Sequence, residues 1–413
     1  MMTFEQAIAV LDARKSIGMT FGTAKLRGVL DRAGWRPDRA KFVHVAGTNG
    51  KGSVCRMTAS VLQAAGYRTG LFTSPTLGGL LEDITINGVS IPVDTFAAYV
   101  GRLVEHEDEN DRLSYFEMET GVALFYFSEH TDVAVVECGL GGRDDATNVI
   151  PAPTVAVITA ISADHTDILG DSIAEIAAHK CAIAKPPCVV VASPHQDAQA
   201  LEVILRHAAE HNLTVQMPSI PTIAEQSARS LTFEAGGETY RLPVGGTFQV
   251  DNAMLAIQAA RVFGVDAATI RKGLERTTFP CRQEWVCERP IRLMDGGHNP
   301  QGVAALADSL KAWEISPITA VIGMLADKDV DTAVRLLSPH LKTAVCCTPP
   351  NPRALDAAAL AAKFEQAGVA AVAIDDPIEA WQHGESIAGD QPLMVAGSFY
   401  LCAVIRPQMS KNK

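Results

Sequence analysis

The feature that most constrains this chain is a glycine-rich loop set between an apolar run and a helical pattern. Residues 42–46 form a short, mostly apolar run that predicts a buried parallel strand, and residues 54–65 predict a helix that ends at Gly66. The loop between them reads Gly47, Thr48, Asn49, Gly50, Lys51, Gly52 and Ser53. Because glycines let backbone N–H groups turn toward an anion at a helix N-terminus, this unit predicts a phosphate-binding loop.

Two side chains of the loop have a specific use in phosphate binding. Lys51 supplies a mobile positive charge, and the Ser53 hydroxyl can reach Mg²⁺. The strict nucleotide-binding spacing needs glycine at position 45 and Ser or Thr at position 52, whereas this chain has Val45 and Gly52. The loop is therefore a variant, and for the loop taken alone a glycine-rich turn with a solvated lysine remains the alternative.

Apolar runs and helical patterns alternate along the first part of the chain. Runs within residues 133–136, 154–161 and 189–192 predict further buried strands, and the alternation indicates a mostly parallel α/β sheet. In such a sheet, ligands bind beyond the carboxyl ends of the strands, which is where the glycine-rich loop lies. Residues 213–247 differ in character and predict a β-hairpin insert.

The strand pattern restarts after a linker at Pro280–Arg282. Residues 291–322 predict a strand, a helix and a second strand. The 413 residues are too many for one ordinary core. We expect a P-loop-type domain with a mostly parallel sheet and substrate loops over residues 1–283, and a smaller, Rossmann-like C-terminal α/β domain over residues 284–413.

Composition limits the partners and the compartment. The formal net charge of −12 argues against a nucleic-acid or anionic-membrane partner, since both need a basic surface. The start of the chain has no signal-peptide pattern, and no run approaches the ~18 apolar residues that span a bilayer. The nine cysteines include no C-x-x-C pair, which indicates free thiols in a reducing compartment. We therefore expect a cytoplasmic protein.

Three further side chains lie where such a sheet would bind a ligand. Glu137 closes an apolar strand, and a carboxylate there is costly unless it is paired, for example with Arg143, or binds a cation such as Mg²⁺. His165 follows Asp164 after the next strand, where a helix cap or a core hydrogen bond is the alternative. Lys180 lies among apolar residues of a helix, a setting in which lysines usually extend their charge to the surface.

Together these motifs resemble those of the folylpolyglutamate synthase and dihydrofolate synthase family, which belongs to the Mur ligase superfamily. The matching segments follow the family's order along nearly the whole chain: His44–Ser53, Ser74–Pro75, Phe116–Glu117, Glu137–Asn148, Asp164–His165, Leu169–Gly170, Glu175–Ala177, Lys180, Gln249, Asn252, Pro280, Arg282, Glu284, Asp295–Pro300, Asp327–Asp329 and Gly397–Ser398. The resemblance implies an ATP-dependent ligase that adds L-glutamate to the carboxylate of a pteroate or folate. ATP would activate the carboxylate as an acyl phosphate, the amine would attack it, and ADP and phosphate would leave.

The resemblance also implies which residues bind ATP. Lys51 and the amides of the loop would hold the β- and γ-phosphates. Asn252, Arg282 and Asp295 match positions that contact the nucleotide, with His298 nearby. The second domain would close over the first to complete the site.

Two Mg²⁺ sites follow from the same resemblance. Ser74 and Glu137 would hold one ion with Ser53 close by, and His165 would hold the second. Lys180 matches the lysine that carries a CO₂-derived carbamate, a group that turns a cation into a carboxylate-like ligand. The candidate catalytic residues are Lys51, Lys180 and His165.

One segment departs from the family pattern. The family continues Ser-Pro-His-Leu and then Glu-Arg-Ile, whereas this chain has Thr76 in place of the histidine and Asp83 in place of the arginine. In the family this loop borders the acyl substrate, so the reversed charge would change how an anionic substrate is received. Two expectations stand side by side: a variable loop in an enzyme that still acts on folate, or the same chemistry on a non-folate carboxylate or with a different amino acid.

Two other classes of function compete with the ligase. A nucleotide-binding regulator would have no need of a second metal site, and the presence of Glu137, His165 and Lys180 argues against it. A simple phosphotransferase or ATPase could use the same loop, but the second-domain motif at Asp295 and His298 favours the ligase. Many relatives act as monomers, so we expect a monomer whose partners are small-molecule substrates.

Overall fold

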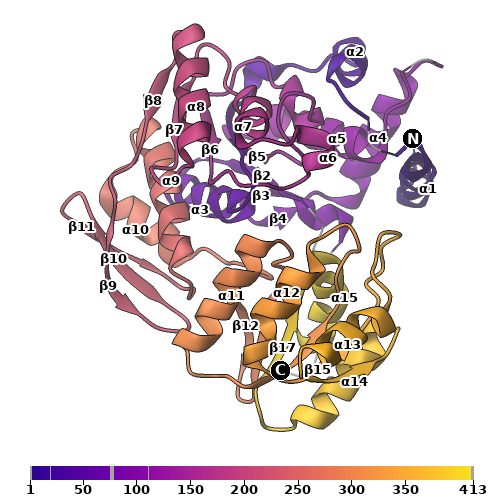
Figure 1. Ribbon diagram of the computed structural model, residues 1–413. Coiled ribbons are helices and arrows are strands. Elements are labelled where there is room, and N and C mark those ends of the chain that lie inside the picture. The colour runs from indigo at the N-terminus through magenta and orange to yellow at the C-terminus, as the bar shows by residue number, and fades with distance from the viewer. Residues whose placement is uncertain (1, 19, 75–78, 110, 411–413) are drawn as a thin grey trace.

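The computed structural model describes residues 2–18, 20–74, 79–109 and 111–410, and these form two α/β bodies, one above the other in Figure 1. The upper body contains an eight-stranded sheet and the lower body a six-stranded sheet. A three-stranded antiparallel sheet lies at the left of the upper body. Two parallel-rich sheets flanked by helices confirm the predicted α/β class.

The eight-stranded sheet has the order β4-β3-β2-β5-β1-β6-β7-β8. Its strands are β1 (Lys41–Ala46), β2 (Thr69–Phe72), β3 (Ile84–Ile86), β4 (Val89–Ser90), β5 (Val133–Glu137), β6 (Val155–Ile158), β7 (Val189–Ala192) and β8 (Thr214–Gln216). Neighbours from β2 to β8 are parallel, whereas β3 runs antiparallel to β2 and β4 antiparallel to β3. Strands β5 and β6 are Val-rich and buried along their whole length, as expected of a sheet that is covered on both faces.

Helices cover both faces of this sheet. They are α1 (Phe4–Arg14), α2 (Ala24–Arg32), α3 (Lys51–Ala64), α4 (Val93–Glu105), α5 (Tyr115–His130), α6 (Thr166–Leu169), α7 (Ile173–Cys181), α8 (Ala198–Glu210), α9 (Phe248–Val262) and α10 (Ala267–Glu275), with short 3-10 turns η1 (Lys15–Ile17), η2 (Pro37–Arg39), η3 (Leu80–Asp83) and η4 (Ala146–Val149). One apolar core joins Phe72 of β2 to α5, and another joins Val43 and Val135 to α3 and α9. The second core fixes α3, which follows the glycine-rich loop, against the middle of the sheet.

The predicted hairpin insert is confirmed, and it carries one more strand. Strands β10 (Leu231–Ala235) and β11 (Glu238–Leu242) form the hairpin, and β9 (Thr222–Gln226) pairs antiparallel with β10. The hairpin alternates buried and exposed residues, which made it visible in the sequence. All residues of β9 are exposed, so the strand had no apolar alternation to reveal it.

The six-stranded sheet of the lower body has the order β12-β13-β17-β14-β15-β16. Its strands are β12 (Glu284–Glu288), β13 (Ile291–Asp295), β14 (Ile318–Ile322), β15 (Leu341–Cys346), β16 (Ala370–Ala373) and β17 (Leu393–Ala396), and its helices are α11 (Pro300–Ala312), α12 (Val330–Leu337), α13 (Ala357–Gln366), α14 (Pro377–Ala388) and α15 (Phe399–Ser410), with the 3-10 turn η5 (Ser338–His340). Only β12 is antiparallel to its neighbour. Because this sheet begins at Glu284, we propose the domain boundary between residues 283 and 284.

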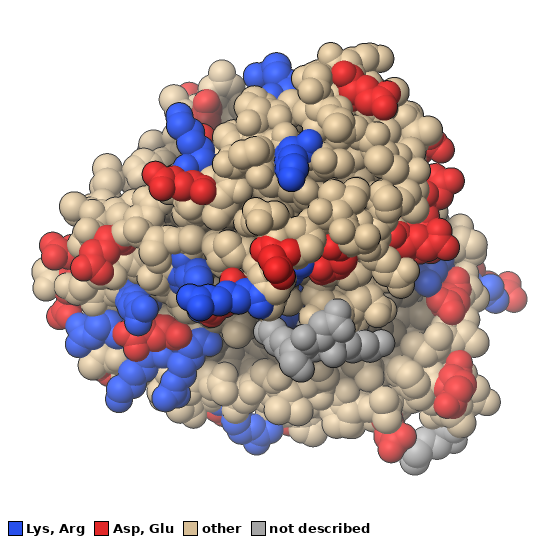
Figure 2. Space-filling model, turned by 90° about the horizontal axis from the view of Figure 1, so that it is seen from below, with Lys and Arg blue, Asp and Glu red and all other residues tan. Residues whose placement is uncertain are grey.

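The charged surface, the helix lengths and the cysteines bear on the compositional expectations. The face seen from below carries side chains of both charge signs, with Lys and Arg gathered on its left side (Figure 2). None of the helices in the described ranges is long and apolar enough to cross a bilayer. All nine cysteines are unpaired, and seven of them are buried.

Candidate active site

The glycine-rich loop connects β1 to α3 in the predicted order, and its backbone demands glycine. Gly50 has φ +88°, and a Cβ atom there would lie 2.2 Å from Oδ1 of Asn252 on α9. At Gly47, with φ +152°, a Cβ atom would lie 1.8 Å from Oγ1 of Thr159. The side chains of Asn252 and Thr159 leave no room for a larger residue at these two positions. Glycine here also lets the loop backbone come close to a ligand.

Two lysines converge on one carbonyl group of the loop. Lys51 Nζ donates to the carbonyl oxygens of Gly47 and Thr48, each at 3.2 Å. Lys180 Nζ donates to the same Gly47 oxygen at 2.9 Å, although Lys180 lies 133 positions further along the chain. The side chain of Lys180 is therefore directed at the loop and not at the surface, whereas its role in the site stays a prediction.

Lys180 has an unusual environment for a lysine. It lies on α7, which starts with a capping box between Ser172 and Glu175, and it is only 4% exposed. Burial, followed by the charge of Lys51, lowers the pKa of Lys180 to about 7. Near neutral pH a large share of this amine is therefore uncharged and nucleophilic.

Glu137 ends β5 beside the loop, as predicted. Its carboxylate is buried, and burial raises its pKa against the opposing charges of Lys51 and Arg282. The backbone N–H of Ser74 donates to Glu137 Oε2 at 3.3 Å, so the two residues predicted to share a metal ion meet. A Cβ atom at Gly52 would lie 3.3 Å from the same oxygen, so this glycine leaves space beside the carboxylate.

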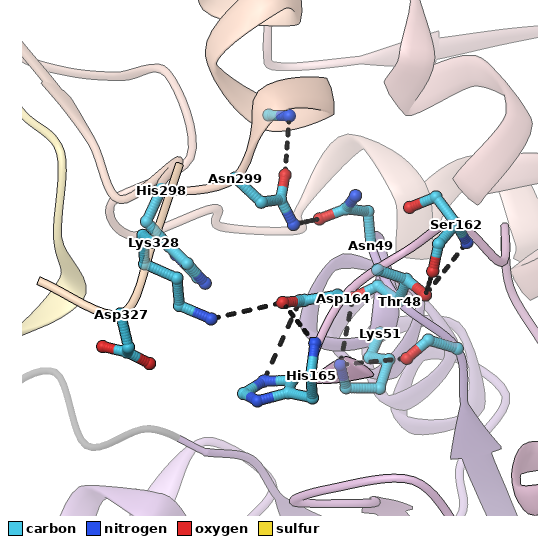
Figure 3. A network of polar contacts seen from close by, with 12 residues as sticks. Thr48, Asn49, Lys51, Ser162, Asp164, His165, His298, Asn299, Asp327 and Lys328 are labelled. Atoms are coloured by element: carbon cyan, nitrogen blue, oxygen red, sulfur yellow. Dashed lines mark hydrogen bonds and ion pairs between the residues drawn. The ribbon is translucent and has the colours of Figure 1, made fainter. Parts of the chain in front are cut away.

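The pair Asp164–His165 lies between Lys51 of the loop and Lys328 (Figure 3). His165 has φ +52° and starts α6, with its Nε2 3.8 Å from Asp164 Oδ2. Burial lowers the pKa of His165, which favours the neutral imidazole that metal ions bind. Although burial opposes it, the charges of His165 and of Lys328 hold the pKa of Asp164 below its usual value. Lys328 comes from the lower body, and its Nζ is 3.2 Å from Asp164 Oδ1.

Side-chain amides also join the two bodies at the loop (Figure 3). Asn299 Nδ2 donates to Asn49 Oδ1 at 3.0 Å, and Asn49 Nδ2 donates to Gln301 Oε1 at 2.7 Å. Gln301 also accepts from the Ser162 hydroxyl at 3.1 Å. Sequence reasoning did not anticipate these contacts; the only signal was that Asn49 and Asn299 lie inside recognised motifs.

Of the four residues predicted to contact the nucleotide, Asn252 lies against Gly50 of the loop. Arg282, Asp295 and His298 come from the linker and the lower body. The Arg282 guanidinium lies over the Phe399 ring at 4.2 Å. Asp295 ends β13, and burial raises its pKa although it accepts two backbone N–H bonds. Burial lowers the pKa of His298 to about 4, so its imidazole is neutral.

The donor set fits Mg²⁺ better than a metal that needs an all-protein cage. Among the residues that the structure describes, no three His, Cys, Asp or Glu side chains are grouped to hold a metal ion. Mg²⁺ takes one or two carboxylates and completes its octahedron with water and phosphate oxygens. The buried Glu137, the nearby Ser74 and the buried Ser53 in the first turn of α3 match that preference.

The structure places near the site one residue, Arg56, that sequence analysis had not selected. It does not describe the substituted position Thr76. Arg56 lies one helical turn after Gly52 on α3, within the electrostatic field of Glu137, and nothing in the spacing of the motif singled it out. The alternative for Glu137, an ion pair with Arg143, is not among the ion pairs of the described residues. The substituted position Thr76 lies outside the described residues, whereas Asp83 is described and buried.

Comparison with known proteins finds Mur ligase domains in both bodies of the chain. Residues 45–260 match the Mur ligase middle domain, and residues 281–399 match the Mur ligase, glutamate ligase domain. The chain is 32% identical to a probable bifunctional folylpolyglutamate synthase/dihydropteroate synthase of Haloferax volcanii over 98% of its own length. It spans about half the length of that relative and of a similar one from Halobacterium salinarum (50% and 52%).

Other relatives match from end to end. The folylpolyglutamate synthase of Lacticaseibacillus casei is 30% identical over the full length of both chains. The structure of Escherichia coli FolC in complex with DHPP and ADP has a TM-score of 0.87 at 28% identity and 98% coverage of both chains. Mycobacterium tuberculosis folylpolyglutamate synthase complexed with ADP and AMPPCP gives 0.85 at 31% identity, covering 98% of this chain and 99% of that one. The chain therefore belongs to the folylpolyglutamate synthase/dihydrofolate synthase family of Mur ligases.

Proposed function

We propose that this protein is an ATP-dependent acid–amino-acid ligase that joins L-glutamate to the carboxylate of a pteroate or folate and releases ADP and phosphate. The observation that carries the proposal is the convergence of Lys51, Lys180, Glu137 and His165, from four separate segments, on one glycine-rich loop. Relatives that match end to end bear the same activity in their names. The cellular role would be folate biosynthesis and one-carbon metabolism.

Different residues would bind the phosphates, bind the metal ions and exclude water during activation of the acyl group. The loop amides and Lys51 would hold the transferring phosphoryl group, whose charge builds on its oxygens in the transition state. Mg²⁺ would neutralise part of that charge at the sites formed by Ser74 with Glu137 and by His165. The lower body would bring Asp295 and His298 over the loop and exclude water from the acyl phosphate.

Lys180 is proposed to carry a carbamate. The neutral amine would attack CO₂, form a C–N bond and release one proton, so that the uncharged amine becomes an anionic carbamate. A lysine whose pKa is about 7 has the uncharged form that this step needs. The carbamate would replace the repulsion between Lys180 and Lys51 by attraction and would help to order the second metal ion.

The decisive experiment is phosphate release from ATP and Mg²⁺ with dihydropteroate, tetrahydrofolate and unrelated carboxylates, each against a panel of amino acids. The proposal predicts release that depends on both a pteroate-type acid and glutamate. Release without an acceptor would indicate an ATPase, and nucleotide binding without release would indicate a regulator. Turnover of another carboxylate alone would favour the alternative, a ligase of the same chemistry with a different acyl substrate or amino acid.

The remaining expectations belong to the same proposal. We expect a cytoplasmic monomer whose partners are small-molecule substrates and which binds neither nucleic acid nor membrane. Light scattering with and without ATP and glutamate tests the monomer, since a dimer would double the measured mass.

A further inference from the structure

The chain continues past the last residue of β6, Ile158, and this continuation holds the glycine-rich loop. The N–H groups of Thr48 and Asn49 both donate to the carbonyl of Ala160, at 3.0 and 3.4 Å. The Thr48 hydroxyl donates to the Ser162 carbonyl at 2.9 Å and accepts from the Ser162 N–H at 3.0 Å (Figure 3). The shape of the loop therefore depends on where the continuation of β6 lies.

The same contacts decide which backbone groups of the loop can bind a phosphate. Because Ala160 accepts from the N–H groups of Thr48 and Asn49, a phosphate is left with the donors at the start of α3, Lys51–Ser53. The first N–H groups of a helix have no partner within the helix, and the N-cap residue Gly50 has no side chain to cap them. Any shift of the β6 continuation would move these donors away from their place.

The side-chain amide of Gln196 supports this continuation where the neighbouring strand has ended. Strand β7 pairs with β6 as far as Ala192, opposite Ile158, and the chain then leaves the sheet. Beyond that point, Gln196 Oε1 accepts from the Ile161 N–H at 3.0 Å. Its Nε2 donates to the Thr159 carbonyl at 2.7 Å and to the Ile158 carbonyl at 3.4 Å. The amide thus donates and accepts as the main chain of a further strand residue would.

The supported segment also leads to the histidine that is predicted to bind a metal ion. His165 follows Ser162 by three residues on the same continuation. Thr159 and Ile161 are 0% and 5% exposed, so water cannot easily replace Gln196 as their hydrogen-bond partner. One half-buried side chain therefore supports the segment that contacts the loop and carries His165.

We propose that Gln196 is a positioning residue of the active site, which holds the phosphate-binding loop and His165 in place through its hydrogen bonds to the end of β6. The inference deepens the proposed function and rests on it. Without the amide, the Thr159 carbonyl and the Ile161 N–H would lose their partners in a buried place, and the segment would move to satisfy them. A displacement of about 1 Å is enough to lower the rate of such a reaction strongly.

The first test removes the amide and keeps the length of the side chain. Gln196→Met loses all three hydrogen bonds, and we expect the KM for ATP to rise about tenfold. The Mg²⁺ concentration that gives half-maximal activity should rise about tenfold as well, because the support of a metal ligand is lost. Both are measured well below the unfolding temperature. A role in stability alone would lower that temperature and leave both values unchanged.

The second test uses pH to restore the hydrogen bonds. The carboxylate introduced by Gln196→Glu cannot donate to the Thr159 carbonyl, whereas the protonated carboxyl group donates one hydrogen bond and accepts another, as the amide does. Carbonyl oxygens beside a carboxyl group favour its protonated form. The ratio of kcat/KM between this variant and the wild-type protein should therefore rise as the pH is lowered from about 8 to about 6. The neighbouring ion pair His195–Asp251 is present in both proteins, so its contribution cancels in the ratio.

A matched control and two outcomes decide the inference. Gln199→Ala changes an exposed glutamine in the first turn of α8 and should leave every readout unchanged. An unchanged KM for ATP in a folded Gln196→Met protein, or a ratio for Gln196→Glu that does not depend on pH, overturns the inference. If Gln196→Met does not fold, the pH ratio decides. A wild-type protein that binds ATP but joins no acid to an amino acid would overturn the proposed function instead, and calorimetry of ATP binding would still test Gln196.

Discussion

The two sides of the candidate site differ in how they are built. The nucleotide side is centred on one short loop whose glycines and Lys51 are close in sequence, and Lys180 reaches it from 133 positions further along the chain. The side that the family resemblance assigns to the acyl substrate is assembled from the end of η3, α3 and α5, where Asp83 and Glu119 are both buried although they lie 36 positions apart. A local motif therefore reports the phosphate-binding loop, whereas tertiary packing brings together the residues on the other side.

The largest expected effect comes from removing the loop's charge. Lys51→Ala should lower kcat/KM by about 100- to 1,000-fold, because the ammonium stabilises charge that develops on the phosphoryl oxygens. Phosphate release measures the effect, and the exposed Lys272→Ala on α10 is the control. Equal loss in both variants would mean that the effect is not specific to the loop.

The next prediction concerns Lys180, which contacts the loop from α7. Lys180→Ala should lower activity by roughly 10- to 100-fold, and short carboxylates added to the buffer should restore part of it. Lys180→Arg should show the same loss without restoration, since guanidinium neither forms the carbamate nor leaves space for an acid. Full activity of Lys180→Ala would remove this lysine from the mechanism.

The carbamate has its own pH signature. Because the pKa of Lys180 is about 7, the amine is mostly protonated below pH 7 and mostly neutral above it. Carbamate formation should therefore be weaker near pH 6 than near pH 8 at a fixed CO₂ concentration, because the reaction uses the neutral amine and releases a proton. Carbon-13 NMR with labelled CO₂ measures the signal, which should be absent in Lys180→Ala.

A smaller effect concerns the stability of the loop. Gly50→Ala should lower the free energy of unfolding by about 3 kcal/mol, because a positive φ and a clash with Asn252 add. Gly264→Ala has a similar φ of +76° but no atom within 4 Å of its Cβ, and it should cost about 1 kcal/mol. Denaturant unfolding of both variants separates strain from the clash.

The smallest effect concerns the junction of the two bodies. Gln301→Ala removes the acceptor of Asn49 and Ser162 and should raise the KM for ATP by about 3- to 10-fold, the value of one or two neutral hydrogen bonds. Lys311→Ala, at an exposed position of the same helix, should have no effect. A larger loss in kcat than in KM would indicate a role beyond closure.

The sequence predicted those parts of the fold whose signals lie within a few neighbouring residues. Apolar runs located the central strands, and Gly66 and Pro280 marked the end of a helix and the linker. The polar strand β9 and the amide contacts of Asn49 could not be predicted, because exposed strands and carboxamides leave no periodic or compositional trace. Asp83 was noticed only as a reversed charge. The nearness of Asp83 to Glu119, whose pKa it raises, needed the packing of α5 to be seen.

The amide contacts between the two bodies have a consequence for the conditions in which the protein works. Asn49, Asn299 and Gln301 are neutral at every physiological pH, and hydrogen bonds between uncharged groups are not weakened by dissolved ions. The ion pair beside them, Lys328–Asp164, is only 7% and 14% exposed and is therefore shielded from screening, whereas Arg229–Glu288, a second ion pair between the bodies, is 53% and 57% exposed. The contacts at the loop should therefore keep their strength from dilute buffer to concentrated salt, so that osmotic change in the cell would leave this part of the site intact.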